Sequence, residues 1–180
     1  MVVPRNHEPV LLICAMFSQD TSALDWAESH LVERYGQITE RTSDQPFDQT
    51  RYYEREMGKQ LVKRLIAFES LVDPGLLPAI KLAAIDLETR IKQAHEWPNQ
   101  RPLNVDPGYL TEAKLVLATT KDRDHRIYLG QGIFGEITLY FQQHRWNASR
   151  WTYPDYQTEG VIDFLERCRT YLRKRYQSVR

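Results

Sequence analysis

A continuous apolar run near the start of the chain restricts the fold more than any other feature of the sequence. Residues 10–17 read VLLICAMF, without one charged side chain. Alternate side chains of a strand point to opposite faces of its sheet, so a strand of this composition is stable only where both faces are covered. The run is far too short to cross a bilayer. It therefore predicts a central strand of a sheet with further layers on both sides.

A helix and several weaker elements are predicted after this strand. Ser22 can accept a hydrogen bond from a free amide at a helix start, and Gly36 is a natural stop. Between them, apolar residues recur at helical spacing: Leu24, Ala27, Leu31 and Tyr35. Weak alternation over residues 37–44 predicts an edge strand, and residues 64–71 predict another strand. Residues 47–58 read as a loop with one short helical turn.

A second helix is predicted after residue 72. Asp73 can accept hydrogen bonds from the free amides, and Pro74 at the first helical position loses no hydrogen bond. An apolar stripe follows at helical spacing: Leu77, Ile80, Ala84, Leu87 and Ile91.

The helix-start tetrapeptide occurs twice. VDPG stands at residues 72–75 and again at residues 105–108. By analogy, Asp106 and Pro107 are expected to start a third helix. Its buried face would consist of Leu110, Ala113, Leu117 and Ala118. A strand over residues 114–119 is the alternative.

A hairpin is predicted in the second half of the chain. Its arms are residues 125–130 and 133–142, joined at Gly130 and Gly132, because glycine adopts the positive φ that such turns need. Strict alternation assigns one face of the second arm to Ile133, Gly135, Ile137, Leu139 and Phe141. It assigns the other face to Glu136, Thr138 and Tyr140.

A strand and a helix are predicted to complete the chain. Residues 145–153 are expected to add a third strand after a turn at residues 147–149. Residues 158–176 predict a helix with the apolar stripe Val161, Leu165, Cys168 and Leu172. Its other face is basic, with Arg167, Arg169, Arg173, Lys174 and Arg175.

The order of these elements predicts an α+β fold. Strand, helix, two strands and helix form a ferredoxin-like βαββαβ-type unit, followed by an additional C-terminal β-hairpin or meander and a terminal helix. We expect one domain over residues 1–180. Residues 1–105 would form the ferredoxin-like part, and residues 106–180 the helix, hairpin and C-terminal helix extension.

Composition narrows the classes of partner and the location. Lysine plus arginine and aspartate plus glutamate number 24 each, so net charge gives no attraction to nucleic acid or acidic membranes. Cys14 and Cys168 both fall at apolar-pattern positions, which favours core packing in a reducing cytoplasm. We therefore expect a cytoplasmic protein without a membrane segment.

A dense charged segment precedes the hairpin. Residues 121–126 read KDRDHR. Facing a cleft, Lys121, Asp122 and Arg126 could bind an anionic group, and His125 is the candidate for moving a proton. The alternative is a solvated connection whose charges pair among themselves.

Aromatic and acidic residues elsewhere could complete the same cleft. The candidate ligand-binding residues are Tyr52, Tyr53, Glu54, Glu136, Trp151 and Tyr153, and Asp155 and Tyr156 lie close to the last two in the sequence. Flat side chains can stack on a planar ligand, although half-buried packing is their commoner role. Glu136 and Arg126 are alternatively expected to pair across the hairpin.

A metal site is not predicted. Asp122, Asp124, His125 and Glu136 are of suitable chemistry, but no His-x-x-x-His or paired Cys-x-x-Cys spacing accompanies them. No cofactor follows from the sequence, and neither a nucleophile elbow nor a reactive cysteine setting supports covalent catalysis.

Several longer motifs occur together: FDQTRYYEREMG, LVDPG, NVDPGYLTEAKLVLATTKDRDHRIYLGQGIFGEITL and WTYPDY. On these motifs, which span nearly all of the chain, the sequence resembles a bacterial family known as domain of unknown function 4416. The resemblance implies no defined activity, although some members are labelled GTP-binding. This chain contains no G-x-x-x-x-G-K-[ST] loop, and Arg123 stands where guanine recognition normally uses an acidic residue.

The sequence thus leads to a ligand hypothesis and two alternatives. The first is a small anionic ligand, phosphorylated or nucleotide-like, in a cleft beside residues 121–126. The second is a non-catalytic module that meets a protein partner through a Tyr/Trp-rich surface. The third, which the balanced charge disfavours, is RNA binding through the basic final helix.

Overall fold

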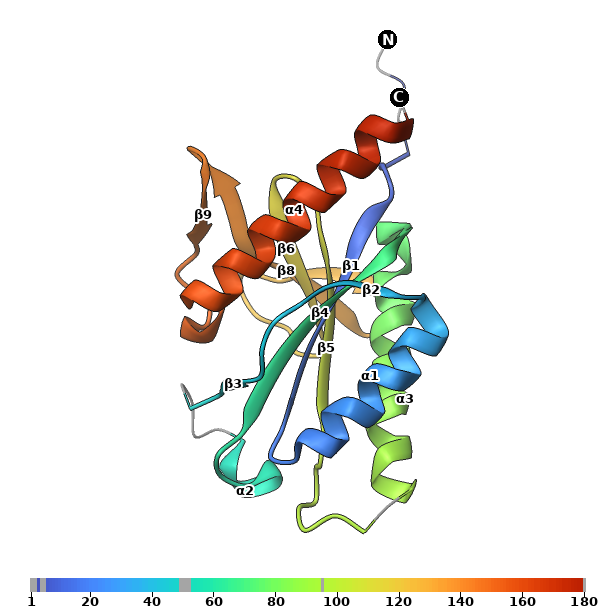
Figure 1. Cartoon of the computed structure of the whole chain (residues 1–180), viewed down its shortest axis with the longest axis vertical. Coiled ribbons are helices and arrows are strands. Elements are labelled where there is room, and N and C mark those ends of the chain that lie inside the picture. The colour runs from blue at the N-terminus through green and yellow to red at the C-terminus, as the bar shows by residue number, and fades with distance from the viewer. Residues whose placement is uncertain (1–2, 4–5, 49–52, 95, 180) are drawn as a thin grey trace.

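The computed structural model describes residues 3, 6–48, 53–94 and 96–179 (Figure 1). The first half contains β1 (Val10–Ser18), α1 (Thr21–Tyr35), β2 (Ile38–Arg41), β3 (Gln45–Pro46), α2 (Glu54–Met57), β4 (Val62–Val72) and α3 (Leu77–Ala94), which follows a 3₁₀ turn, η1 (Pro74–Leu76). The second half contains β5 (Asn104–Leu110), β6 (Lys114–Thr119), β7 (Ile127–Gly130), β8 (Ile133–Gln142), β9 (Arg145–Ala148), the 3₁₀ turn η2 (Pro154–Gln157) and α4 (Glu159–Val179). The fold is α+β.

The described strands form one nine-stranded antiparallel sheet. Its main order is β2-β4-β1-β5-β6-β8-β7, with β3 paired to β4 and β9 paired to β8. All nine residues of β1 are buried at the centre of this sheet, as the apolar run predicts. In the described part of the chain, no helix has the length and apolar character needed to cross a membrane.

Helices cover both faces of the sheet (Figure 1). On one face, Leu12, Cys14 and Met16 of β1 pack against α1 and α3. On the other face, Leu11 and Ile13 pack against α4. The two clusters are separate, so β1 contributes alternate side chains to two cores.

The predicted helices on these faces are confirmed, but the predicted cap residue of α1 is corrected. The stripes of α3 and α4 are buried as expected. Asp73 accepts a hydrogen bond from the amide of Gly75 at 2.8 Å, which fixes η1 ahead of α3. The cap of α1 is Asp20, whose Oδ1 accepts from the amide of Ser22 at 2.8 Å, so the prediction of Ser22 as cap was wrong.

The third predicted helix is not present, because Asp106 and Pro107 lie in β5. Pro107 stands opposite Cys14 of β1, and β5 is paired with β6 only from Gly108 onward. A proline can remain in a strand whose other edge is not paired at that position. The fully buried Val105 and Leu110 draw the segment into the sheet, so tertiary packing overrides the local helix-start signal. The alternative strand over residues 114–119 is confirmed as β6.

The hairpin is confirmed, but its predicted faces were wrong. Gly130 and Gly132 have φ values of 109° and 75°, as the turn requires. A bulge shifts the register of β8 against β6 between Leu139 and Ile137. Strict alternation fails beyond it, so Ile137 is 41% exposed while its neighbour Glu136 is buried.

Three further strand predictions are corrected or confirmed. The last strand is β9 (Arg145–Ala148), so Asn147 lies within it and the expected turn at residues 147–149 was wrong. The chain reverses instead at Gln143 and His144, which both have positive φ. Strands were also confirmed at the predicted edge position, β2, and over residues 64–71 within β4.

Candidate functional site

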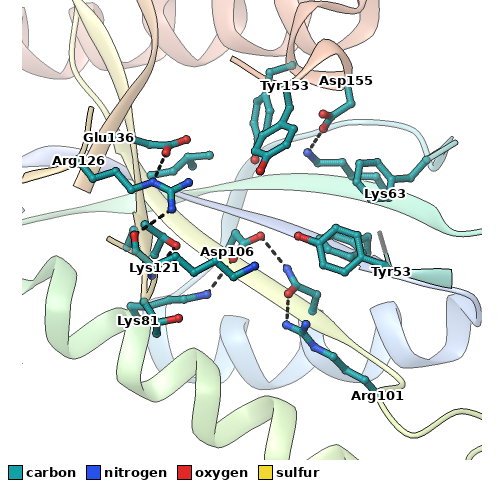
Figure 2. Close-up of a pocket in the computed structure, with 18 residues that line it drawn as sticks. Tyr53, Lys63, Lys81, Arg101, Asp106, Lys121, Arg126, Glu136, Tyr153 and Asp155 are labelled. Carbon is teal, nitrogen blue, oxygen red and sulfur yellow. Dashed lines mark hydrogen bonds and ion pairs between the residues drawn. The ribbon is translucent and has the colours of Figure 1, made fainter. Parts of the chain in front are cut away.

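A split in the sheet creates the site. β5 and β6 pair only from Gly108 to Leu110 opposite Leu117 to Leu115. Beyond these residues β5 continues along β1 to Asn104, and β6 continues along β8 to Thr119. The facing edges of β5 and β6 are therefore not paired there within the described residues. A pocket of about 210 Å³ lies at this split, on the sheet face that α4 covers (Figure 2).

The described lining of the pocket combines charged and aromatic side chains. The cationic ones are Lys63, Lys81, Arg101, Lys121 and Arg126, and the carboxylates are Asp106, Glu136 and Asp155. The aromatic ones are Phe17, Phe47, Tyr53, Tyr153 and Tyr156. Asn104, Leu117, Ala118, Thr119 and Thr120 complete the wall. Five cations against three carboxylates leave this lining with an excess of positive charge.

Lys81 reaches the pocket from the opposite side of the sheet. It belongs to α3, which packs on the face away from the pocket. Its Nζ donates to the carbonyl oxygen of Val105 and to Oδ1 of Asp106, both at 2.8 Å. The ammonium is buried, and it lies at the floor of the pocket (Figure 2).

Asp106 is held by several donors. Besides Lys81, Nδ2 of Asn104 donates to its Oδ2 at 2.7 Å, and Arg101 in turn donates to Oδ1 of Asn104. Burial acts to raise the pKa of Asp106, but the charge and hydrogen bonds of these partners hold it below its ordinary value. Asp106 is therefore a fixed carboxylate, already neutralised by Lys81.

A second buried ion pair joins Lys63 of β4 to Asp155 of η2. The ammonium of Lys63 also lies 3.6 Å from the ring centroid of Tyr156. Burial lowers the pKa of Lys63, and the Asp155 carboxylate opposes this shift. Burial raises the pKa of Tyr156 well above its ordinary value, so the phenol stays neutral. These contacts of Lys63 with Asp155 and Tyr156 fix η2 over the sheet.

Glu136 organises the third charged group. Its Oε2 accepts from Nε of Arg126 at 2.7 Å, which confirms the predicted pair across the hairpin, and lies 3.2 Å from Nε2 of His125. The imidazole stacks on the indole of Trp151 with centroids 4.8 Å apart. Nη1 of Arg126 donates to the carbonyl oxygen of Lys121 at 2.9 Å. The guanidinium is therefore fixed in orientation beside the pocket.

The structure brings together half of the residues that the sequence suggested for ligand binding or catalysis. Tyr53, Lys121, Arg126, Glu136 and Tyr153 line the pocket. His125 and Trp151 pack behind Glu136, whereas Asp122 is exposed and Glu54 in α2 does not line it. Tyr52 lies outside the described residues. Ligand binding by these residues remains a prediction.

Sequence reasoning missed four of the charged lining residues. Lys63, Lys81, Arg101 and Asp106 were not assigned to the site. Lys63 shares the alternating face of Leu65 and Ala67, which is a signal for an inward charge, but the adjacent Arg64 obscures it in the sequence. Lys81 borders the apolar stripe of α3 and reads as solvated, and Asp106 reads as a cap. Asp155 and Tyr156 were noticed only as neighbours of a stacking surface.

The basic face of α4 is largely engaged with the rest of the molecule. Nε of Arg167 lies 2.7 Å from Oε2 of Glu40. Arg169 lies 3.7 Å from the ring centroid of Phe141 and donates to the carbonyl oxygen of Glu112. These contacts favour a structural role for this face. Among the described residues, no three His, Cys, Asp or Glu side chains are grouped so that they could hold a metal ion.

Fold and site together define an α+β protein with a charged pocket where an antiparallel sheet splits. The chain belongs to the family described as Domain of unknown function (DUF4416), whose family model matches residues 8–171. Comparison with curated proteins gave no match, and neither did comparison with solved structures.

Proposed function

We propose that the protein binds a small anionic ligand, phosphorylated or nucleotide-like, in the pocket between β5 and β6. One observation carries this proposal: each described carboxylate of the lining is already paired with a cation of the lining. The N–H groups that these pairs leave over within the described residues, such as Nη2 of Arg126, therefore favour a ligand that brings negative charge. Inside a partly buried pocket such a charge is worth more than at the open surface.

Arg126 and Lys121 are the proposed anion contacts. Glu136 and the carbonyl oxygen of Lys121 use Nε and Nη1 of Arg126, and the described residues leave Nη2 without a partner. A guanidinium held in this way loses little side-chain entropy when it binds an anion. Arg101 contributes less, because it is directed to Glu88 at 3.3 Å and to Asn104.

Any proton transfer in this pocket is proposed to involve Glu136. His125, the candidate acid/base residue of the sequence, contacts Oε2 of Glu136 and does not line the pocket. It is therefore a positioning residue in this proposal, because its proton can reach a ligand only through Glu136.

We also infer that the first part of the chain is a ferredoxin-like unit. The order β2-β4-β1-β5 with antiparallel pairs supports it, as does the packing of α1 and α3 on one face. The single domain with its division at residue 105 stays a prediction. The cytoplasmic location stays a prediction as well, supported by two free buried cysteines.

A thermal-shift screen with inorganic phosphate, AMP and GMP tests the binding proposal. A ligand at a hundred times its Kd adds about 2.7 kcal/mol to the free energy of unfolding. For a domain of this size the melting temperature should rise by about 5–10 °C. Arg126→Ala and Lys121→Ala should each lose more than half of the shift.

Arg123→Ala is the matched control, because Arg123 is exposed in the same turn and does not line the pocket. It should keep the full shift. Equal ligand-induced rises in melting temperature in all three variants would rule out Arg126 and Lys121 as the anion contacts. The absence of any shift with all three compounds would count against the proposed function itself.

The protein-interaction alternative is favoured by one different surface. β7 forms an edge of the described sheet, and Ile127 and Tyr128 on it are 71% and 60% exposed. Exposed apolar edge strands are templates for pairing with another strand. If β7 pairs with a second copy, sedimentation velocity should detect a dimer that Ile127→Lys abolishes and Leu82→Lys on α3 preserves. A monomer at all concentrations would contradict this self-association.

A further inference from the structure

The pocket has two chemically different ends. Phe17, Phe47 and Tyr53 form an aromatic wall at one end, with centroids 4.7 Å apart for the two phenylalanines and 4.8 Å apart for Phe17 and Tyr53. This wall lies at the ends of β1 and β3 and before α2. Lys121 and Arg126 lie at the other end, beyond β6 and before β7. In Figure 2 they stand on the opposite side of the pocket from Tyr53.

Lys81 provides a buried N–H donor for an anion beside the cationic end of the pocket. An ammonium carries three N–H donors, and Val105 and Asp106 use two of those of Lys81. The described residues provide no partner for the third, although the side chain is more than nine-tenths buried and lines the pocket. A buried donor without a partner is costly unless a ligand or water accepts from it.

Size and charge limit what can occupy both ends. Pockets for drug-sized ligands measure about 300–1,000 Å³, so a pocket of about 210 Å³ suits a smaller molecule. Five side chains of the described lining are cationic and three are carboxylates, and Arg101 is also directed to Glu88 outside the lining. A phosphate monoester carries about −1.5 to −2 charges at pH 7 on a single phosphoryl group, whose oxygens accept hydrogen bonds from ammonium and guanidinium groups.

We propose that the ligand is a phosphate monoester of a single planar ring. Its phosphoryl group contacts Lys81, Lys121 and Arg126, and its ring lies against Tyr53 with Tyr153 beside it. Nucleoside triphosphates and dinucleotides are disfavoured, because a pocket of about 210 Å³ is too small for their additional phosphoryl groups. This inference rests on the proposed function and specifies its ligand class.

Isothermal titration calorimetry with three probes tests the inference: ethyl phosphate, phenyl phosphate and ATP. Phenyl phosphate should bind at least tenfold more tightly than ethyl phosphate, because only its ring reaches the aromatic end. ATP should bind at least tenfold more weakly than phenyl phosphate. These comparisons use the same wild-type chain, so they do not depend on the folding of any variant.

Aromatic variants then locate the preference for the ring. Tyr53→Leu and Tyr153→Leu should each reduce the ratio between phenyl and ethyl phosphate to below threefold, with the affinity for ethyl phosphate changed by less than twofold. Tyr128→Leu, at an exposed tyrosine outside the pocket, should keep the full ratio. Melting temperatures of the free variants identify any that does not fold.

The possible failures are distinguishable. Equal affinities for ethyl and phenyl phosphate would overturn the planar-ring inference and leave anion binding intact. ATP binding more tightly than phenyl phosphate would overturn the restriction to one phosphoryl group. If neither monoester nor ATP bound, the proposed function would fail together with the inference.

Discussion

Gly108 sits where two backbones must approach closely. A Cβ at this position would collide with the carbonyl oxygen of Val116 and would lie 2.6 Å from Cδ2 of Leu117. β6 cannot give way easily, because its other edge pairs with β8. We expect Gly108→Ala to lower the free energy of unfolding by about 1–3 kcal/mol. Urea unfolding followed by circular dichroism measures this loss.

Gly160 provides the matched control for this substitution. A Cβ there meets only the flexible amide end of Gln45, which can rotate away. Alanine is also favoured over glycine in a helix by up to about 1 kcal/mol, and Gly160 lies in the first turn of α4. Gly160→Ala should therefore be neutral or slightly stabilising. Similar losses in the two variants would contradict the close approach at Gly108.

Asp44 gives stability a defined dependence on pH. Both of its carboxylate oxygens accept from the buried Arg64, at 2.6 and 2.7 Å. These hydrogen bonds hold the pKa of Asp44 below its ordinary value. A carboxylate with a lowered folded pKa stabilises the protein above its unfolded pKa, about 3.9, and loses this contribution as pH falls through the folded value.

The Asp44→Asn variant tests this dependence. At pH 7 it should be less stable than the wild type by about 1–3 kcal/mol, because Arg64 keeps Asp25 and Glu28 as partners. Below pH 4 the difference should begin to shrink, because the unfolded chain then takes up a proton at Asp44, and it should be lost as pH falls through the lowered pKa of folded Asp44. Urea midpoints at pH 7, 5 and 3 give the comparison, and a constant difference would refute the ionic role of Asp44.

Single residues show where prediction of the site from the sequence stops. Lys121, Arg126 and Glu136 could be found because they crowd into a short segment around a recognisable hairpin. Lys81 could not be found, because its role depends on a gap between β5 and β6. Both strands lie outside α3 in the sequence, so the pattern of α3 carries no information on the gap. The register of β5 against β6 determines that gap, and no local pattern encodes it.

At the scale of elements, the repeated VDPG tetrapeptide shows how context decides conformation. Residues 72–75 precede α3, where Asp73 caps an exposed turn. Residues 105–108 lie in β5, where Val105 and the neighbouring strand β1 provide buried packing. α1, α3 and α4 were predicted correctly because their apolar stripes extend over several turns, and β1 because a run of eight apolar residues needs cover on both faces. The bulge in β8 was missed because one additional residue leaves no signature in composition.

The pair of Lys81 and Asp106 links α3 to β5 through the sheet. Removing one partner leaves a buried charge uncompensated, so Lys81→Met should lower the free energy of unfolding by about 3–5 kcal/mol. The double variant Lys81→Met/Asp106→Leu removes both charges and should regain most of that loss. Chemical unfolding of the four proteins of this cycle gives the coupling energy.

The outcome of this cycle separates two roles. A coupling energy above about 1.4 kcal/mol, equivalent to tenfold in the unfolding equilibrium, supports a buried pair that acts as a unit. Additive losses would mean that water already screens both groups. In that case Lys81 would not be a fixed donor at the floor of the pocket.

At the scale of the whole molecule, one sheet supports two separate cores. Cys14 lies in the core under α1 and α3, and Cys168 lies in the core under α4. Both thiols are buried, and burial raises the pKa of Cys14 to about 12 and that of Cys168 well above its ordinary value. Neither thiol should react in the folded state, because the thiolate is the reactive form.

These two cysteines therefore report on whether the two cores open together. We expect the single-cysteine variants Cys14→Ala and Cys168→Ala to show the same urea midpoint for thiol labelling, because β1 contributes to both cores and cannot leave one without disturbing the other. Labelling with a chromogenic disulfide, compared with the circular dichroism midpoint of each variant, measures this directly. If Cys168 became reactive at a lower urea concentration, α4 would detach as a separate unit. Because η2 precedes α4 and fixes Asp155 in the pocket, such detachment would also open the proposed ligand site before the rest of the fold was lost.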